Sequence, residues 1–270
     1  MNSSAFLQAF FWWRKSFSFI RKNKLMHYIL YPLIVAIVLF VYSISWTSDL
    51  VDYLMKFLYD WTGQPSENPG EDWIQWAAFI GDSMLRGILW IFSLLIMWKI
   101  SKYSTLILMS PLLSLLSAKV DGILTGVDAP FSLAQLFKDM VRGIALSIRN
   151  LLAELFFVIG LGLLNIFIAL FFPILDIALS PISLVLSFLI GCYYSGGAIV
   201  DYALENKRFS YKSTLKFLRE NKSIAIGFGA IYTVLFRIPF IGIALAIVTC
   251  TVGSSMLIHE WDKNGKLNVQ

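Results

Sequence analysis

An arginine interrupts a long apolar run in the last third of the chain. Arg237 lies within an apolar stretch from about Ile224 to Ile258. A guanidinium keeps its charge at any workable pH, and a charge at the centre of a bilayer costs at least about 2.5 kcal/mol. We therefore predict that the chain turns at Arg237 and that Pro239 starts a second helical arm. Arg237 is a turn marker first and a functional candidate second.

Three further cations recur on one predicted helix. Lys138, Arg142 and Arg149 follow one another at intervals of four and seven residues, which places them within about 40° of one another around a helix. Such a row beside a membrane either anchors the helix to lipid headgroups or lines a route for an anion, and the sequence leaves both interpretations open. Lys24 and His27, just before the first apolar block, are candidates for the same chemistry.

Carboxylates near the apolar segments predict charge pairs. Asp82 and Arg86 are one helical turn apart, so we expect them to pair with each other. Glu154 lies at the start of an apolar block. We place it at the membrane interface, near enough to Arg149 for pairing.

A second acidic pair follows a long apolar block. Asp201 and Glu205 are one turn apart and precede a basic segment, residues 207–222. We expect both carboxylates to form salt bridges with that segment at the base of a helical hairpin.

The sequence offers little material for an enzyme or a metal site. The only histidines, His27 and His259, lie far apart, and Cys192 and Cys250 lie in apolar segments without a CxxC pattern. No GxSxG, HExxH or P-loop motif occurs. The stretch GFGAIY at 227–232 lacks the third glycine of a dinucleotide fingerprint and indicates close helix packing. We expect no enzyme activity, no metal and no cofactor.

The composition identifies the environment of these residues. The chain has 270 residues, of which 58% are hydrophobic and only 14% charged, whereas soluble domains are about 45–50% apolar and about 25% charged. The apolar residues gather in the blocks Tyr28–Trp46, Gly87–Trp98, Leu151–Phe172, Ile174–Val200 and Ile224–Ile258. Because a helix needs roughly 20 apolar residues to cross a bilayer, we predict an all-helical integral membrane protein. The net charge of +5 then reflects orientation and contact with lipid headgroups, and not nucleic acid.

Charge asymmetry predicts the topology of a single membrane domain, 1–270. Residues 1–27 read as a basic, aromatic segment in the headgroup layer, or as an inward extension of the next helix. Residues 47–76 read as an acidic extracytoplasmic loop, so both termini are expected in the cytoplasm. Residues 151–200 and 223–258 read as helical hairpins with basic flanks. The arm before Arg237 is too short to span comfortably, so we expect at least one hairpin to penetrate the bilayer only partly.

Several motifs resemble one known family of membrane proteins. They are NKLMHYILYPL (23–33), SPLLSLLSAKVDGILTG (110–126), FKDMVRG (137–143), DYALENKRFS (201–210), FLRENKSIAIGFGAIY (217–232) and RIPFIG (237–242). Their order resembles that of the CysZ sulfate permeases and their eukaryotic relatives, the etoposide-induced membrane proteins. The resemblance implies two long transmembrane helices with partly penetrating hairpins, homo-oligomers, a location in the inner membrane and the uptake of sulfate.

One stretch departs from the family pattern. In the sulfate permeases a Gly-Leu-Arg-Arg-like stretch before the first span is associated with the anion, whereas this chain reads Lys24, Leu25, Met26 and His27. Two guanidinium forks are thereby replaced, and bidentate capture of an oxyanion is lost. Two functions remain open: a permease or channel for sulfate or a related anion, and a non-transporting protein of the same fold that organises the membrane or binds partners.

Overall fold

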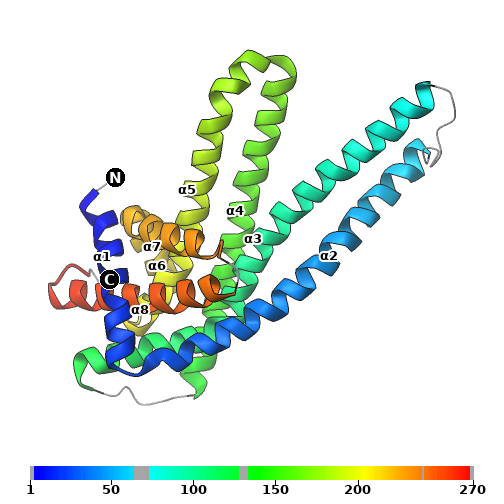
Figure 1. The fold of residues 1–270 in the computed structure, drawn as a ribbon. Helices are drawn as coiled ribbons and strands as arrows, with labels where there is room; N and C mark the ends of the chain where they lie inside the picture. Colours follow the sequence, from blue (N-terminus) through cyan, green and yellow to red (C-terminus); the bar gives the residue numbers. More distant parts are fainter. Residues whose placement is uncertain (1–2, 64–72, 128–132, 239, 268–270) are drawn as a thin grey trace. The chain divides into compact units, whose positions relative to one another are not determined.

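The computed structural model describes residues 3–63, 73–127, 133–238 and 240–267, and within these ranges the chain forms helices and no strand. The elements are α1 (Ser3–Lys22), η1 (Leu25–Ile29, a 3₁₀ helix), α2 (Leu30–Thr62), α3 (Trp73–Thr125), α4 (Leu133–Phe171), α5 (Pro173–Asn206), α6 (Tyr211–Glu220), α7 (Lys222–Leu235) and α8 (Ile241–Lys263) (Figure 1). The predicted all-helical membrane fold is confirmed.

Five of the described helices are long and apolar enough to cross a membrane by length and composition. They are Leu25–Asp60, Trp73–Thr125, Met140–Phe171, Pro173–Asn206 and Ile241–Lys263. The expected count of two long spans is therefore not confirmed. The α7 helix has 14 residues, a length of about 21 Å, which is shorter than the roughly 30 Å of a bilayer core. Partial penetration by the hairpin of α7 and α8 stays a prediction.

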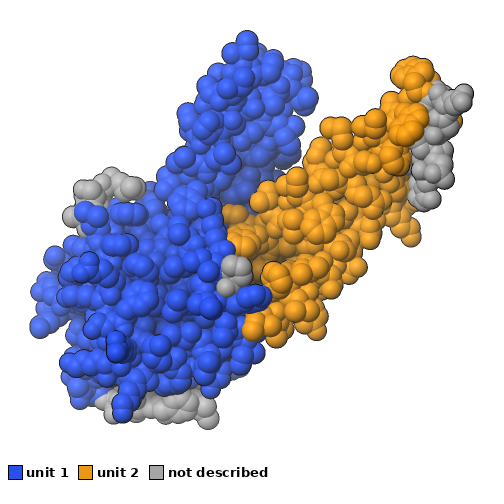
Figure 2. Space-filling model, in the orientation of Figure 1, with its two compact units in different colours: residues 1–36, 103–270 blue, residues 37–102 orange. Residues whose placement is uncertain are grey.

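The chain divides into two compact units. Unit 1 contains residues 1–36 and 103–270, and unit 2 contains residues 37–102 (Figure 2). Consequently α2 and α3 each contribute residues to both units. The prediction of one membrane domain stays a prediction.

The expected loop conformation of residues 47–76 is wrong for the residues that the structure describes, and their extracytoplasmic location stays a prediction. Residues 47–62 continue α2 and residues 73–76 begin α3, while residues 64–72 lie outside the described residues. Thr47, Val51 and Met55 are buried, and their spacing of four residues forms one helix face. This periodicity extends the helix beyond the apolar block, because the aspartates between these positions lie on its other faces.

The N-terminal segment forms a separate helix that packs within unit 1. Its buried face consists of Ala9, Ser16 and Ile20, whereas Phe10 and Phe17 are exposed. The short η1 helix separates α1 from α2, so α1 is not an inward extension of the first span. Exposed aromatic rings fit contact with the interfacial layer of a membrane, and that placement stays a prediction.

Close contact between α5 and α7 forms the centre of unit 1. A Cβ atom added at Gly196 would collide with the carbonyl oxygen of Ala225, and one added at Gly229 would collide with the carbonyl oxygen of Cys192. Small residues of this kind let two helix backbones approach within membranes. The glycines of GFGAIY thus serve helix packing, as the sequence indicated. In Figure 1, α4 and α5 lie side by side and are joined at Phe172.

The glycine contact yields a prediction about stability. We expect Gly229→Ala to lower the free energy of unfolding by about 3 kcal/mol or more, because the two backbones must move apart. Gly160→Ala in α4 is the matched control, since nothing lies within 4 Å of the added Cβ. It should be neutral or should stabilise the helix by up to about 1 kcal/mol. Unfolding in detergent micelles measures both, and equal stabilities would refute the close contact.

Candidate functional site

The most enclosed cation of the candidate set is Arg142 on α4. Its Nη2 atom donates to Asp201 Oδ1 on α5 and to Thr214 Oγ1 on α6, each at 2.6 Å. Its Nη1 atom donates to the backbone carbonyl of Phe209. The Arg142 side chain is 16% exposed and that of Asp201 only 1%. We call this arrangement the Arg142 clamp, and it joins α4, α5 and the start of α6.

The clamp excludes both interpretations of the basic row for Arg142. The guanidinium is directed at protein acceptors, so Arg142 is neither a headgroup anchor nor an open ligand for an anion. Lys138 is exposed and Arg149 is half-buried. The three cations therefore share a helix face, as the spacing indicated, but they occupy different environments.

The two acidic residues of α5 differ from the prediction. Asp201 pairs with Arg142 of α4, and Glu205 accepts a hydrogen bond of 2.6 Å from Ser114 Oγ of α3. Both carboxylates are buried, because the face of α5 that carries them is turned toward the interior of unit 1. The expected salt bridges with residues 207–222 are thus replaced by contacts with helices that precede α5.

Serine hydroxyls form a second buried polar group that sequence reasoning missed. Ser117 Oγ on α3 donates to the carbonyl oxygen of Tyr202 at 3.0 Å, and it lies 2.8 Å from Ser255 Oγ on α8. Asn206 Nδ2 donates to the same Ser117 hydroxyl at 2.6 Å. The signal in the sequence was the recurrence of Ser110, Ser114 and Ser117 at helical spacing. Small hydroxyls at such spacing typically connect membrane helices.

Glu154 is enclosed by protein and does not pair with Arg149 as expected. It is fully buried in unit 1 and accepts a hydrogen bond of 2.6 Å from the hydroxyl of Tyr103, which is also buried. Arg149, its expected partner, donates instead to Asn150 Oδ1 at 3.0 Å. The expected location of Glu154 at the membrane interface stays a prediction.

In unit 2, Arg86 does not pair directly with Asp82 as expected. Its Nη1 atom lies 3.4 Å from Asp52 Oδ1 of α2, and its Nη2 atom lies 3.4 Å from the hydroxyl of Tyr59. That hydroxyl donates to Asp82 Oδ1 at 2.7 Å. Tyr59 thus bridges the two predicted partners, because α2 continues as a helix where a loop was expected.

Arg237 lies in the turn between α7 and α8, where the sequence predicted a turn. The α7 helix ends at Leu235 and α8 begins at Ile241. Arg237 is exposed, and its guanidinium lies 5.9 Å from the centre of the Phe188 ring, a distance that allows a cation–π interaction. The prediction that Pro239 starts the second arm lies outside the described residues.

Residues 24–27 lie at the turn that leads into η1, before α2. Lys24 has a φ of 56°, in the left-handed region, and its carbonyl oxygen lies 3.1 Å from His27 Nδ1. Leu25 is buried, whereas Lys24, Met26 and His27 are exposed. Left-handed backbone favours glycine, which is the residue that the family resemblance implies at Lys24. The two candidate cations are therefore accessible at this turn.

A charged cluster lies where α3, the end of α5 and α8 meet. Lys207 Nζ lies 3.0 Å from Asp121 Oδ1 and 3.0 Å from Asp262 Oδ2, and His259 Nδ1 lies 3.2 Å from Asp121 Oδ1. Burial lowers the pKa of Lys207, but the two carboxylates outweigh this effect, so its pKa is raised above 10.5. The sequence placed Lys207 among the basic flanks of a hairpin without indicating these partners.

The family match covers most of the chain. The family model described as "Sulfate transporter CysZ/Etoposide-induced protein 2.4" matches residues 12–246. A protein named sulfate transporter CysZ from Pseudomonas fluorescens strain Pf0-1 is 26% identical over 224 residues, which are 81% of this chain and 80% of that protein.

Two further relatives carry the same name and match shorter segments. The protein from Pseudomonas fluorescens strain Pf-5 is 28% identical over 52% of this chain and 53% of its own length. The protein from Pseudomonas syringae pv. tomato is 26% identical over 57% of this chain and 58% of its own length. The chain thus spans little more than half the length of these two relatives.

The Arg142 clamp predicts a large stability effect. We expect Arg142→Met to lower the free energy of unfolding by about 3–5 kcal/mol, because the buried carboxylate of Asp201 then loses the cation that offsets its charge. The double variant with Asp201→Leu should recover most of this loss. Lys138→Met, at an exposed position of the same helix, is the control and should change stability by at most about 0.5 kcal/mol. Denaturant unfolding in micelles measures these values. A loss for Arg142→Met as small as that of Lys138→Met would refute the clamp and assign Arg142 to the headgroup layer.

The Lys207 cluster predicts a pH dependence. Because the pKa of Lys207 is raised on folding, its stabilising contribution is fully present below its ordinary pKa and is lost as the pH rises through the raised value. We expect Lys207→Met to cost up to about 1 kcal/mol at pH 7, and this difference from the parent should shrink above pH 10.5. Thermal unfolding of both proteins between pH 7 and the alkaline limit tests this. A difference that grows with pH would contradict it.

Proposed function

Because the chain belongs to the family of sulfate transporter CysZ and etoposide-induced protein 2.4, we propose that it carries sulfate or a related anion across a membrane. The proposal depends on one observation, the match to this family over residues 12–246. A relative named sulfate transporter CysZ that aligns over 81% of the chain supports the substrate class. We propose that the protein is a multi-pass protein of a bacterial inner membrane, with cytoplasmic termini, and that it acts as a homo-oligomer and not as an enzyme.

An anion path needs fixed positive charge to offset the dehydration of the ion. The geometry divides the candidate cations into two groups. Arg142 is held by protein acceptors and is assigned a positioning role. The exposed or half-buried cations remain as pathway candidates: Lys24, His27, Lys138, Arg149 and Arg237.

Among these, we propose that Lys24 and His27 take the part of the family's anion-associated stretch. They are exposed, they lie at one turn, and Lys24 has the left-handed backbone that fits the family's glycine.

Sulfate uptake tests the proposed function. Full-length protein in proteoliposomes should take up radiolabelled sulfate above the level of empty vesicles. Lys24→Gln combined with His27→Gln should reduce the rate at least about tenfold, because a hydrogen bond to a charged group contributes roughly 1.5–3 kcal/mol. Lys263→Gln removes an exposed cation at the end of α8 and should leave the rate within about twofold.

The controls separate the function from its site. A parent protein that is folded and inserted but shows no uptake above empty vesicles refutes the transport proposal. If the double variant takes up sulfate at the rate of the parent, transport stands and the role of Lys24 and His27 is refuted.

The second candidate function is a membrane-organising or partner-binding protein of the same fold. Two observations favour it: Met26 and His27 stand where the resemblance implies arginines, and Arg142 is occupied by protein acceptors. The vesicle assay decides between the two functions, because this candidate requires a folded protein without anion passage.

A further inference from the structure

A groove on unit 1 combines an apolar wall with a cationic end. It has a volume of ≈ 470 Å³, within the roughly 300–1,000 Å³ of ligand sites. Its lining comes from α4, α5, the end of α6 and the start of α7: Phe157, Leu186, Leu189, Ile190, Tyr193, Tyr194, Arg219, Lys222 and Ile226. Every one of these residues belongs to unit 1.

The wall of the groove is one face of α5. Leu186, Leu189, Ile190, Tyr193 and Tyr194 recur at offsets of zero, three, four, seven and eight residues, which is the pattern of a continuous apolar stripe on a helix. Leu186 is 44% exposed, and the other four residues are half-buried. This stripe therefore has no complete cover within the described residues.

Aromatic contacts define the side of the groove next to α4. The rings of Phe157 and Tyr194 lie 6.4 Å apart with an interplanar angle of 23°, and those of Tyr193 and Tyr194 lie 5.2 Å apart. Asn150 of α4 donates to the carbonyl oxygen of Tyr194 at 3.0 Å, which fixes the two helices beside each other. Phe157 is nonetheless 46% exposed.

The cations gather at one end only. Arg219 and Lys222 are exposed and form no ion pair with a carboxylate of the described residues. From Tyr193 the wall continues for about 10 Å to Leu186, and the residues along this part are apolar. The groove is thus amphipathic along its length.

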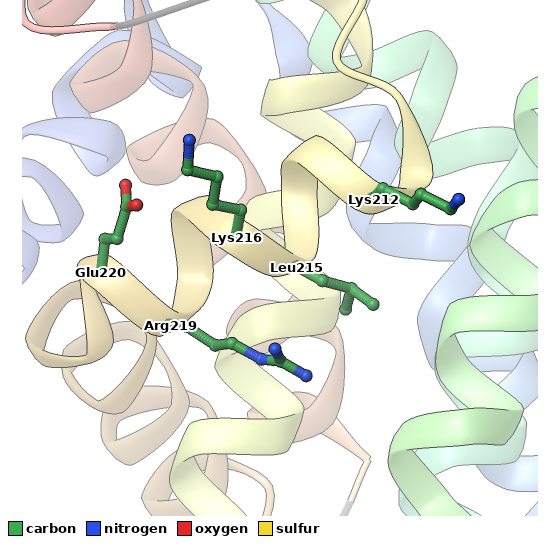
Figure 3. Close-up of a pocket in the computed structure, with 5 residues that line it drawn as sticks. All are labelled: Lys212, Leu215, Lys216, Arg219 and Glu220. Atoms are coloured by element: carbon green, nitrogen blue, oxygen red, sulfur yellow. The ribbon is translucent and has the colours of Figure 1, made fainter. Parts of the chain in front are cut away.

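Figure 3 shows how α6 directs its side chains. Arg219 and Leu215 extend from one side of the helix, while Lys216 and Glu220 extend from another. Together with Lys212 these residues line a second hollow of ≈ 340 Å³, which shares Arg219 with the groove. Arg219 is therefore the cation of α6 that reaches the apolar wall, and Lys212 and Lys216 provide matched positions without that contact.

We propose that this groove binds an anionic phospholipid, with the phosphate on Arg219 and Lys222 and an acyl chain along the α5 stripe. A cationic end followed by an apolar run matches the order of phosphate and hydrocarbon in a lipid. Basic pockets between membrane helices bind anionic headgroups in this way. A soluble anion leaves the apolar wall uncovered, and a zwitterionic lipid such as phosphatidylcholine carries a choline cation beside its phosphate, so it offsets less of the charge of Arg219 and Lys222. The proposal does not depend on anion transport.

Lipid binding by the purified full-length chain tests the proposal. Delipidated protein in detergent is titrated with phosphatidylglycerol or phosphatidylcholine, and native mass spectrometry gives the Kd of each lipid. We expect Arg219→Gln with Lys222→Gln to weaken phosphatidylglycerol binding about 30-fold, because each cation near an anionic group contributes roughly 1 kcal/mol. Binding of phosphatidylcholine should change less than about threefold.

Three further variants make the outcome specific. Lys212→Gln with Lys216→Gln also removes two positive charges, both from α6, and should change phosphatidylglycerol binding less than about threefold. Leu186→Gln should weaken both lipids, because it places an amide on the apolar wall. Arg219→Lys with Lys222→Arg keeps both positive charges and should retain most of the parent's binding. This result would show that the Gln pair weakens binding through loss of charge and not through loss of folding.

Two results would overturn the proposal. Equal losses for the two Gln pairs would mean that binding follows the total charge of α6 and the start of α7, and not the groove. Displacement by soluble glycerophosphoglycerol at the affinity of the whole lipid would mean a free-phosphate site without an acyl chain.

Discussion

The ion pair between Arg142 and Asp201 determines where the shorter helices of unit 1 lie. The guanidinium connects α4 and α5 and also bonds to Phe209 and Thr214, which lead into and lie within α6. The α7 helix starts directly after α6 and packs against α5 at Gly196 and Gly229. A buried charge with one partner removed costs about 3–5 kcal/mol, so other placements of α6 are unfavourable. The cationic end of the groove is thereby fixed beside the apolar face of α5.

The sequence was sufficient for features that depend on local spacing. The apolar blocks became helices, Arg237 marked a turn, and the glycines at 227 and 229 allowed close packing. Each of these three features follows from the cost of polar groups in hydrocarbon or from the size of a side chain. Both causes act locally and do not depend on the remaining fold.

The partners of the charged residues could not be predicted in the same way. Helical spacing shows that Asp201 and Glu205 share a face, but it does not show that the face is turned toward α3 and α4. The same difficulty affected Arg86, whose partners Asp52 and Tyr59 come from α2. Such contacts join residues that are distant in the sequence, and a single sequence does not contain that information. The acidic segment after the first block was misread because acidic residues are equally compatible with a loop and with the polar faces of a helix.

The distribution of charge also constrains how this fold can bind anions. The guanidinium best shielded from solvent among the candidates, Arg142, is neutralised by Asp201, and the buried carboxylates Glu154 and Glu205 accept hydrogen bonds from hydroxyl groups. The charges left for recognition include Lys138 and Arg149 on α4. The others lie near helix ends: Lys24 before η1, Arg219 at the end of α6, Lys222 at the start of α7 and Arg237 before α8. A cation at a helix end keeps part of its hydration and can still reach an anion. In this fold, buried charged groups therefore position the helices. The exposed and half-buried cations, most of them near helix ends, are available to anionic solutes and lipids.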